Sequence, residues 1–155
     1  MVAGSNPKFG TRWLLCPQCG DGSVITNNGV LWPPSLPGDF VGHLPDDVAG
    51  AWSEARTAHA VGSYTAAEIM CRKILMHVAV DACGSDPGKS FVQYVNELDS
   101  GGYIPKGLTE VVDKVRLRGN VANHDLPASS EPDSRLTMTI TEHLLRGIYE
   151  LPNLI

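Results

Sequence analysis

Residues 116–124 bring together the side chains best suited to chemistry: two arginines, two asparagines and one histidine. The guanidinium group of arginine is permanently charged and forks onto phosphate oxygens, while histidine titrates near neutral pH. A site that cleaves a phosphodiester needs both. The stretch therefore suggests phosphodiester cleavage or phosphate binding. The alternative is that the same residues cap the end of a helix and tie the following loop to backbone groups.

In a cleavage reaction, these residues would take distinct roles. Arg116 or Arg118 would hold the scissile phosphate, and His124 would act as general base or acid at a ribose 2′-hydroxyl. Asn120 would orient the histidine or a water molecule. Lys114 would join the two arginines in a positive patch for phosphate or RNA.

The spacing within this stretch also bears on oligomeric state. On one straight helix, Arg118 and His124 point about 120° apart. Arg116, Asn120 and His124 share a stripe instead, at intervals of four residues. A helix break at Gly119, or a second copy of the site across a two-fold axis, would bring the groups together. We therefore expect a homodimer that pairs through the helical face near residues 116–124.

Composition limits the class of protein. Hydrophobic residues make up 43% of the chain and charged residues 19%, which is typical of a globular domain and argues against disorder. The net charge of -5 means that nucleic acid would need a local basic patch. No stretch is long and apolar enough to cross a membrane, and the N-terminus lacks the pattern of a signal peptide. We expect a cytoplasmic protein.

Two of the four cysteines have the spacing of a metal knuckle. Cys16 and Cys19 lie in Cys-Pro-Gln-Cys-Gly, but a structural zinc site needs four ligands and no second such pair follows. We interpret the pair as a half site without metal, in a protein that needs no cofactor. A zinc ion shared between two subunits is the alternative. Cys71 and Cys83 fall in a helical pattern and are expected to be small buried residues.

The N-terminal region has the pattern of a small β-structure. Asn28-Gly29 between apolar and β-branched residues is typical of a hairpin turn. A two-stranded lobe over residues 11–32 would be marginal alone, so we expect it to pack on the rest of the chain through Trp13 and Trp32. The expected organisation is a lobe over residues 1–32, a Pro-rich connector over 33–45 and a helical domain over 46–155.

From residue 46 onward the periodicity is helical. About five helices are expected, over residues 46–60, 64–83, 91–100, from 105 into the 116–124 stretch, and from about 135 to 151. The second is apolar on nearly every side and should be central, with a polar stripe of Glu68, Arg72, Lys73, His77 and Asp81. The basic members of that stripe form salt bridges or face the 116–124 stretch. His59 and His143 are expected near the surface without a role.

The order of several short pieces matches a known family. They are Leu31-Trp32-Pro33-Pro34, Leu44-Pro45-Asp46-Asp47-Val48, Ala55-Arg56, Tyr64-Thr65-Ala66-Ala67, Met70-Cys71-Arg72-Lys73-Ile74-Leu75-Met76, Gly102-Tyr103-Ile104-Pro105, Gly119-Asn120-Val121-Ala122-Asn123-His124 and Ile148-Tyr149-Glu150-Leu151-Pro152. Through them, residues 31–152 resemble the bacterial domain of unknown function 4145, placed among the HEPN-like helical domains. An N-terminal cysteine knuckle is similar to an accessory found in this family.

This resemblance implies an all-α, HEPN-like bundle that often dimerises, here with a small N-terminal β-hairpin lobe. Relatives occur fused to restriction-type endonucleases or in defence loci. We expect a dimeric interaction module, or one that binds nucleic acid or a nucleotide, whose partners include RNA or a protein from the same operon. The alternative is a metal-independent ribonuclease. HEPN ribonucleases have an Arg followed a few residues later by a His, as do Arg118 and His124, although Gly119 replaces the usual polar residue.

Overall fold

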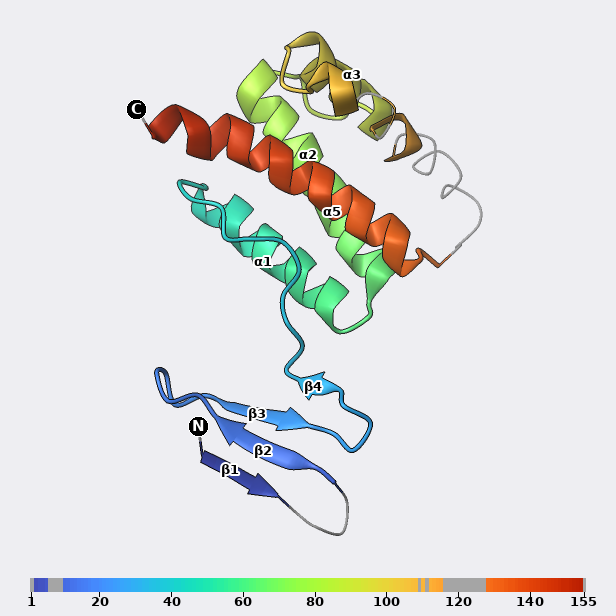
Figure 1. Cartoon of the computed structure of the whole chain (residues 1–155). Coiled ribbons are helices and arrows are strands. Elements are labelled where there is room, and N and C mark those ends of the chain that lie inside the picture. The colour runs from blue at the N-terminus through green and yellow to red at the C-terminus, as the bar shows by residue number, and fades with distance from the viewer. Residues whose placement is uncertain (1, 6–9, 109, 111, 116–127, 155) are drawn as a thin grey trace. The chain divides into compact units, whose positions relative to one another are not determined.

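The computed structural model describes residues 2–5, 10–108, 110, 112–115 and 128–154 (Figure 1). The chain divides into two compact units, Met1–Ser35 and Leu36–Ile155. The first unit is a sheet and the second is helical. Among the described residues, no helix combines the length and the apolar character needed to cross a membrane.

The first unit is a four-stranded antiparallel sheet in which the strands follow one another in chain order. The strands are β1 (Val2–Ser5), β2 (Arg12–Leu15), β3 (Gly22–Ile25) and β4 (Leu31–Trp32). The predicted turn at Asn28-Gly29 joins β3 to β4, and Gly29 takes the positive φ of +81° that such a turn favours. The prediction of only two strands is wrong, because β2 pairs with the other edge of β3 and β1 pairs with β2, which adds two further ladders.

Large side chains of the sheet unit remain in contact with solvent. None of residues 10–35 is buried. Trp13 is 63% exposed and Trp32 is 54% exposed. Their packing against the rest of the chain stays a prediction.

The second unit contains α1 (Asp46–Ala60), α2 (Tyr64–Cys83), α3 (Phe91–Ser100) and α5 (Glu131–Leu145). Local signals set several of these ends. Gly84 ends α2 in the left-handed conformation with φ +65°. Ser90 and Gln93 form a capping box at the start of α3. A short 3-10 turn at Lys106–Leu108 and helical residues at 110 and 112–115 follow α3.

The helical core is organised around α2, as the sequence predicts. This helix packs against α1, α3 and α5 (Figure 1). Small residues allow the close approach, since Ala67, Cys71 and Ala79 have no exposed surface. Leu75 of α2 and Leu145 of α5 are the larger side chains buried with them.

The C-terminal helix differs from its prediction at both ends. It begins at Glu131 rather than near 135, because the Ser130 side chain accepts a hydrogen bond from the Asp133 backbone N–H and caps it. After Leu145 the chain continues as a π-helix over Arg146–Glu150. A π-turn adds about one residue and so rotates the residues after it by about 100°. Leu151, which follows the π-helix and begins a 3-10 turn, is 57% exposed.

Candidate functional site

The residues predicted to do chemistry fall largely outside the structure's described ranges. Arg116, Arg118, Asn120 and His124 all lie outside the described residues. Lys114, predicted to extend their positive patch, is exposed in the helical segment 112–115. The predicted pairing of subunits through this stretch therefore stays a prediction.

The predicted basic stripe of α2 divides between different surroundings. The Arg72 guanidinium lies over the ring of Phe91 on α3, 4.6 Å from the ring centre. Lys73 and His77 instead line a groove between α1 and α2. His77 makes ion pairs of the kind expected of this stripe, with Asp47 and Asp81. Among the described residues, Lys73 has no salt-bridge partner.

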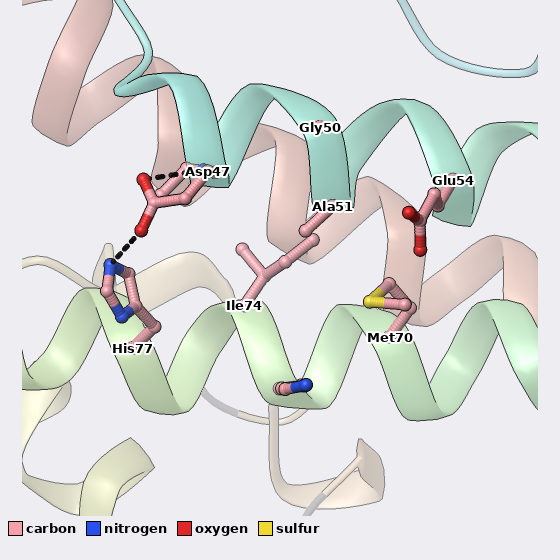
Figure 2. Close-up of a pocket in the computed structure, with 9 residues that line it drawn as sticks. Asp47, Gly50, Ala51, Glu54, Met70, Ile74 and His77 are labelled. Atoms are coloured by element: carbon pink, nitrogen blue, oxygen red, sulfur yellow. Dashed lines mark hydrogen bonds and ion pairs between the residues drawn. The ribbon is translucent and has the colours of Figure 1, made fainter.

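The α1–α2 groove is an open depression of about 370 Å³ (Figure 2). Gly50 and Ala51 of α1 and Ile74 of α2 line its central part. Positions 47, 50, 51 and 54 share one face of α1 because they are three to four residues apart. Positions 70, 73, 74 and 77 share a face of α2 for the same reason.

The borders of the groove carry opposite charges. Asp47 and Glu54 contribute carboxylates from α1, while Lys73 and His77 contribute an ammonium and an imidazole from α2. Figure 2 places Asp47 opposite His77 at one end and Glu54 opposite Met70 at the other. The groove therefore combines a small-residue centre with one acidic and one basic border.

A hydrogen-bonded cluster fixes one end of the groove. The Asp47 carboxylate accepts the Val48 backbone N–H at 2.9 Å through one oxygen, and its other oxygen lies 3.3 Å from His77 Nε2 (Figure 2). Asp81 Oδ2 lies 3.4 Å from the same ring nitrogen. Because both carboxylates face Nε2, this ring nitrogen carries the hydrogen that they accept.

Tyr149 joins this cluster from the π-helix. Its hydroxyl donates a hydrogen bond to Asp81 Oδ2 at 3.2 Å. Burial, followed by the nearby charges of Asp81 and Asp47, raises the pKa of Tyr149 to about 12, so it stays a neutral donor near pH 7. The cluster orients His77 from three elements. Within the described ranges, no group of three or more His, Cys, Asp or Glu side chains is arranged to hold a metal ion.

His59, expected near the surface, is buried. Its Nδ1 lies 2.9 Å from Ser134 Oγ, and its ring meets the edge of Tyr64. Nε2 has no hydrogen-bond partner among the described residues. Burial, and then the charge of Arg135, lower the pKa of His59 against the opposing effect of Glu131. The sequence held a signal for this burial, since His59 continues the stripe of Val48, Trp52 and Ala55.

The Cys16–Cys19 pair lies in the turn between β2 and β3. Both thiols are free and exposed. The Gly20 backbone N–H donates to the Cys16 carbonyl at 2.9 Å, and the Cys16 N–H donates to the Asp21 carbonyl at 2.9 Å. Backbone N–H groups of Cys19 and Gln18, together with the Cys19 thiol, hydrogen-bond to the Cys16 sulfur and lower its pKa.

The other three thiols have raised pKa values. The Asp21 backbone N–H lowers the pKa of Cys19, but the Asp21 carboxylate, the Cys16 sulfur and partial burial together raise it. Cys71 is buried as predicted, and its burial raises the thiol pKa to about 12. Burial and the charge of Glu97 raise the pKa of Cys83, which is half-buried.

In comparison with known proteins, the chain matches the model of one family. The family model described as Domain of unknown function (DUF4145) matches residues 53–154. The match begins within α1 and includes α2, α3 and α5, while the sheet lies outside it. No curated protein and no solved structure matches the chain.

Proposed function

The chain belongs to the DUF4145 family of domains of unknown function, and we propose that it acts as an interaction module that pairs with a second copy of itself through the α1–α2 groove. The observation that carries this proposal is Gly50. A glycine inside a helix costs roughly 0.5–1 kcal/mol relative to alanine. A Cβ at this position would meet nothing within 4 Å. Nothing in the described part of the chain explains the glycine, whereas a second backbone approaching the groove would.

The charges of the groove suit pairing with an identical surface. A two-fold axis along the groove would set α1 of one copy antiparallel to α2 of the other. Residues that lie opposite each other across the groove in one chain would also lie opposite each other across the interface. Asp47 would then face His77 of the partner subunit, and Glu54 would face the basic border that Lys73 provides. Each contact would occur twice, because a two-fold interface is self-complementary.

The size of the face sets the expected affinity. With 15 residues, α1 is about 22 Å long, so one face of two adjacent helices presents roughly 440 Å². Specific interfaces commonly bury about 800 Å² on each partner. The groove face is smaller, so we expect a dimer with a dissociation constant on the order of micromolar.

Substitution of Gly50 tests the proposal directly. Gly50→Ala removes the cost of glycine and should raise the free energy of unfolding by roughly 0.5–1 kcal/mol. Gly50→Leu has open space around it within one chain and should fold, but it would fill the groove. Sedimentation across a concentration series, with a chelator present to remove any bound metal, should show Gly50→Leu as a monomer where the unsubstituted chain is dimeric. A Gly50→Leu protein that dimerises as well as the unsubstituted chain would contradict the proposal.

A charge exchange tests the expected orientation. Glu54→Lys would place two positive groups at each contact, and Lys73→Glu would place two negative groups there. Each should weaken the dimer by about tenfold, which is roughly 1.4 kcal/mol. The double variant should recover most of this loss. Glu110→Lys, at an exposed position outside the groove lining, is the matched control and should leave the dimer unchanged.

RNA or nucleotide binding is the second candidate, and the sequence of residues 114–124 favours it. Lys114, Arg116 and Arg118 supply positive charge beside Asn120 and His124. Several described arginines bind groups of their own chain: Arg56 donates to the Pro37 and Gly38 carbonyls, Arg135 pairs with Glu131, and Arg146 pairs with Asp39, Glu142 and Glu150. Nucleic acid would therefore depend chiefly on this short stretch. A bacterial defence or restriction context, with a partner protein from the same operon, is proposed for both candidates.

Two variants separate binding from cleavage. Charge reversal at Arg116 and Arg118 should weaken RNA affinity, with a reduced dependence on salt. His124→Ala should leave that affinity nearly unchanged but, if the HEPN-like resemblance extends to ribonuclease activity, should lower cleavage of single-stranded RNA by about 10² or more. Intact RNA after incubation with the unsubstituted protein, with and without divalent metal, would reject cleavage. Absence of salt-dependent binding would reject this candidate as a whole.

A further inference from the structure

We infer that Cys16 and Cys19 form one half of a zinc site that a second copy of this chain completes, giving four thiolate ligands. The turn that holds the pair is closed by two hydrogen bonds, from Gly20 N–H to the Cys16 carbonyl and from Cys16 N–H to the Asp21 carbonyl. Gly20 has a φ of +77°, which suits glycine, and this conformation turns the chain back on itself.

The two cysteines lie three positions apart within this closed turn. Both thiols are free and exposed at the same end of the β2–β3 hairpin. A Cys-x-x-Cys pair followed by a glycine is the spacing with which a zinc knuckle directs two sulfurs to one ion. Zinc binds such sulfurs as thiolates. The turn is therefore arranged to present two thiolates to one ion.

Two ligands do not complete a structural zinc site, which is almost always tetrahedral. The described residues offer no third ligand beside the pair, since they contain no metal-binding group of three. Both cysteines are exposed at the end of the β2–β3 hairpin, so a second hairpin can reach the same ion. Two copies of the turn would supply four sulfurs around a two-fold axis. Binding would release the thiol protons to solvent as four zinc–sulfur bonds form.

The absence of buried side chains over residues 10–35, the part of the sheet unit whose burial is described, supports this assignment. None of residues 10–35 is buried, and small units without a core commonly use a metal or a partner for stability. A shared zinc ion supplies both. Disulfide formation between the two thiols is the competing use of the same pair, and the zinc content of the protein distinguishes the two uses.

The test is the zinc content of the full chain, purified under reducing conditions and equilibrated with zinc chloride before excess metal is removed. We expect one zinc ion per two chains. Cys16→Ser and Cys19→Ser should each lose the bound zinc. Cys83→Ser, at a half-buried thiol of the helical unit, is the matched control and should keep it. Replacement of zinc by cobalt should give the visible absorption of a tetrahedral thiolate site in the unsubstituted chain and in Cys83→Ser alone.

Other zinc contents would overturn the inference. One zinc ion per chain would mean that each chain completes its own site. A chain without zinc, or one whose Cys16 and Cys19 form a disulfide in place of binding the metal, would also overturn it. The shared zinc site and the groove dimer have in common only the need for two copies. Gly50→Leu should therefore keep one zinc per two chains, and a chelated unsubstituted chain should still dimerise through the groove, so either idea can fail alone.

Discussion

The sheet unit and the helical unit differ in where their large apolar side chains lie. In the helical unit, Leu75, Leu98 and Leu145 are almost completely removed from solvent. In the sheet unit, Trp13 and Leu15 are more than half exposed, and none of residues 10–35 is buried. Burial of apolar surface is the main favourable term in folding. The helical unit therefore buries the apolar surface that stabilises it, whereas residues 10–35 bury no side chain.

Truncation of a core leucine should have the largest effect. Leu145 is wholly buried, so Leu145→Ala should lower the free energy of unfolding by about 2–5 kcal/mol. Leu15 is 51% exposed, so Leu15→Ala should change the free energy of unfolding by less than about 0.5 kcal/mol. Urea unfolding followed by circular dichroism measures both. Equal losses from the two truncations would break the comparison between the units.

Acid should destabilise the helical unit through His59, to a smaller extent than the core truncation. Burial and the charge of Arg135 lower the pKa of folded His59 below its ordinary value of 6.5. As pH falls below about 6.5, the unfolded chain gains a proton before the folded chain does, so the free energy of unfolding falls. The loss stops growing once the pH is below the lowered pKa of the folded state.

The control for this pH effect is His59→Gln, which cannot titrate. Subtracting its unfolding free energies from those of the unsubstituted chain, pH by pH, cancels the contributions of His77 and the other histidines. A difference that does not vary between pH 7.5 and pH 5 would contradict a buried neutral His59. The sheet unit contains no histidine, since His43 is the first in the chain, so no histidine of its own makes it acid-sensitive.

Removal of a helix cap should have the next largest effect on the free energy of unfolding. The Ser90 side chain accepts the Gln93 N–H, and the Gln93 side chain accepts the Ser90 N–H at 2.8 Å. Ser90→Ala should therefore lower the free energy of unfolding by about 1 kcal/mol. Ser63 occupies the same position before α2 but makes no capping hydrogen bond with its side chain. Ser63→Ala should change stability less, and a larger loss there would show that the cap geometry does not decide the effect.

A change in the β3–β4 turn should leave the stability of the helical unit unchanged, which is the smallest effect expected. Gly29 has a φ of +81°, and the space around it is open, so Gly29→Ala introduces backbone strain of roughly 1 kcal/mol without a clash. Amide hydrogen exchange should become faster in β3 and β4 but stay unchanged in α2. Faster exchange in α2 as well would mean that the two units unfold together.

The helices were predictable because their signals are local. The bounds of α2 follow from its apolar pattern and from Gly84, and those of α3 follow from its periodicity and the glycines after it. The start of α5 was missed, although Ser130 and Asp133 carry a recognisable cap. The four-stranded sheet was harder to foresee. The strand Val-Ala-Gly-Ser of β1 has no alternating pattern, and its place depends on pairing with β2.

The candidate site was less predictable because it depends on contacts between distant residues. His59 bonds to Ser134, which lies 75 positions later in the chain. The charges of Asp47, Glu54 and Lys73 are plain in the sequence, but their common groove depends on how α1 and α2 are rotated against each other. The stretch 116–124 was found by residue type alone, and its geometry stays a prediction.

The central position of α2 also determines where the chain can change length. One residue inserted in the middle of this helix would rotate its second half by about 100°. Val78 and Ala79, both without exposed surface, would then turn away from their present neighbours. The exposed turn at residues 27–30 could take the same insertion without disturbing a buried side chain. Among relatives of this chain, we expect insertions and deletions to collect in such turns and to be rare between Tyr64 and Cys83.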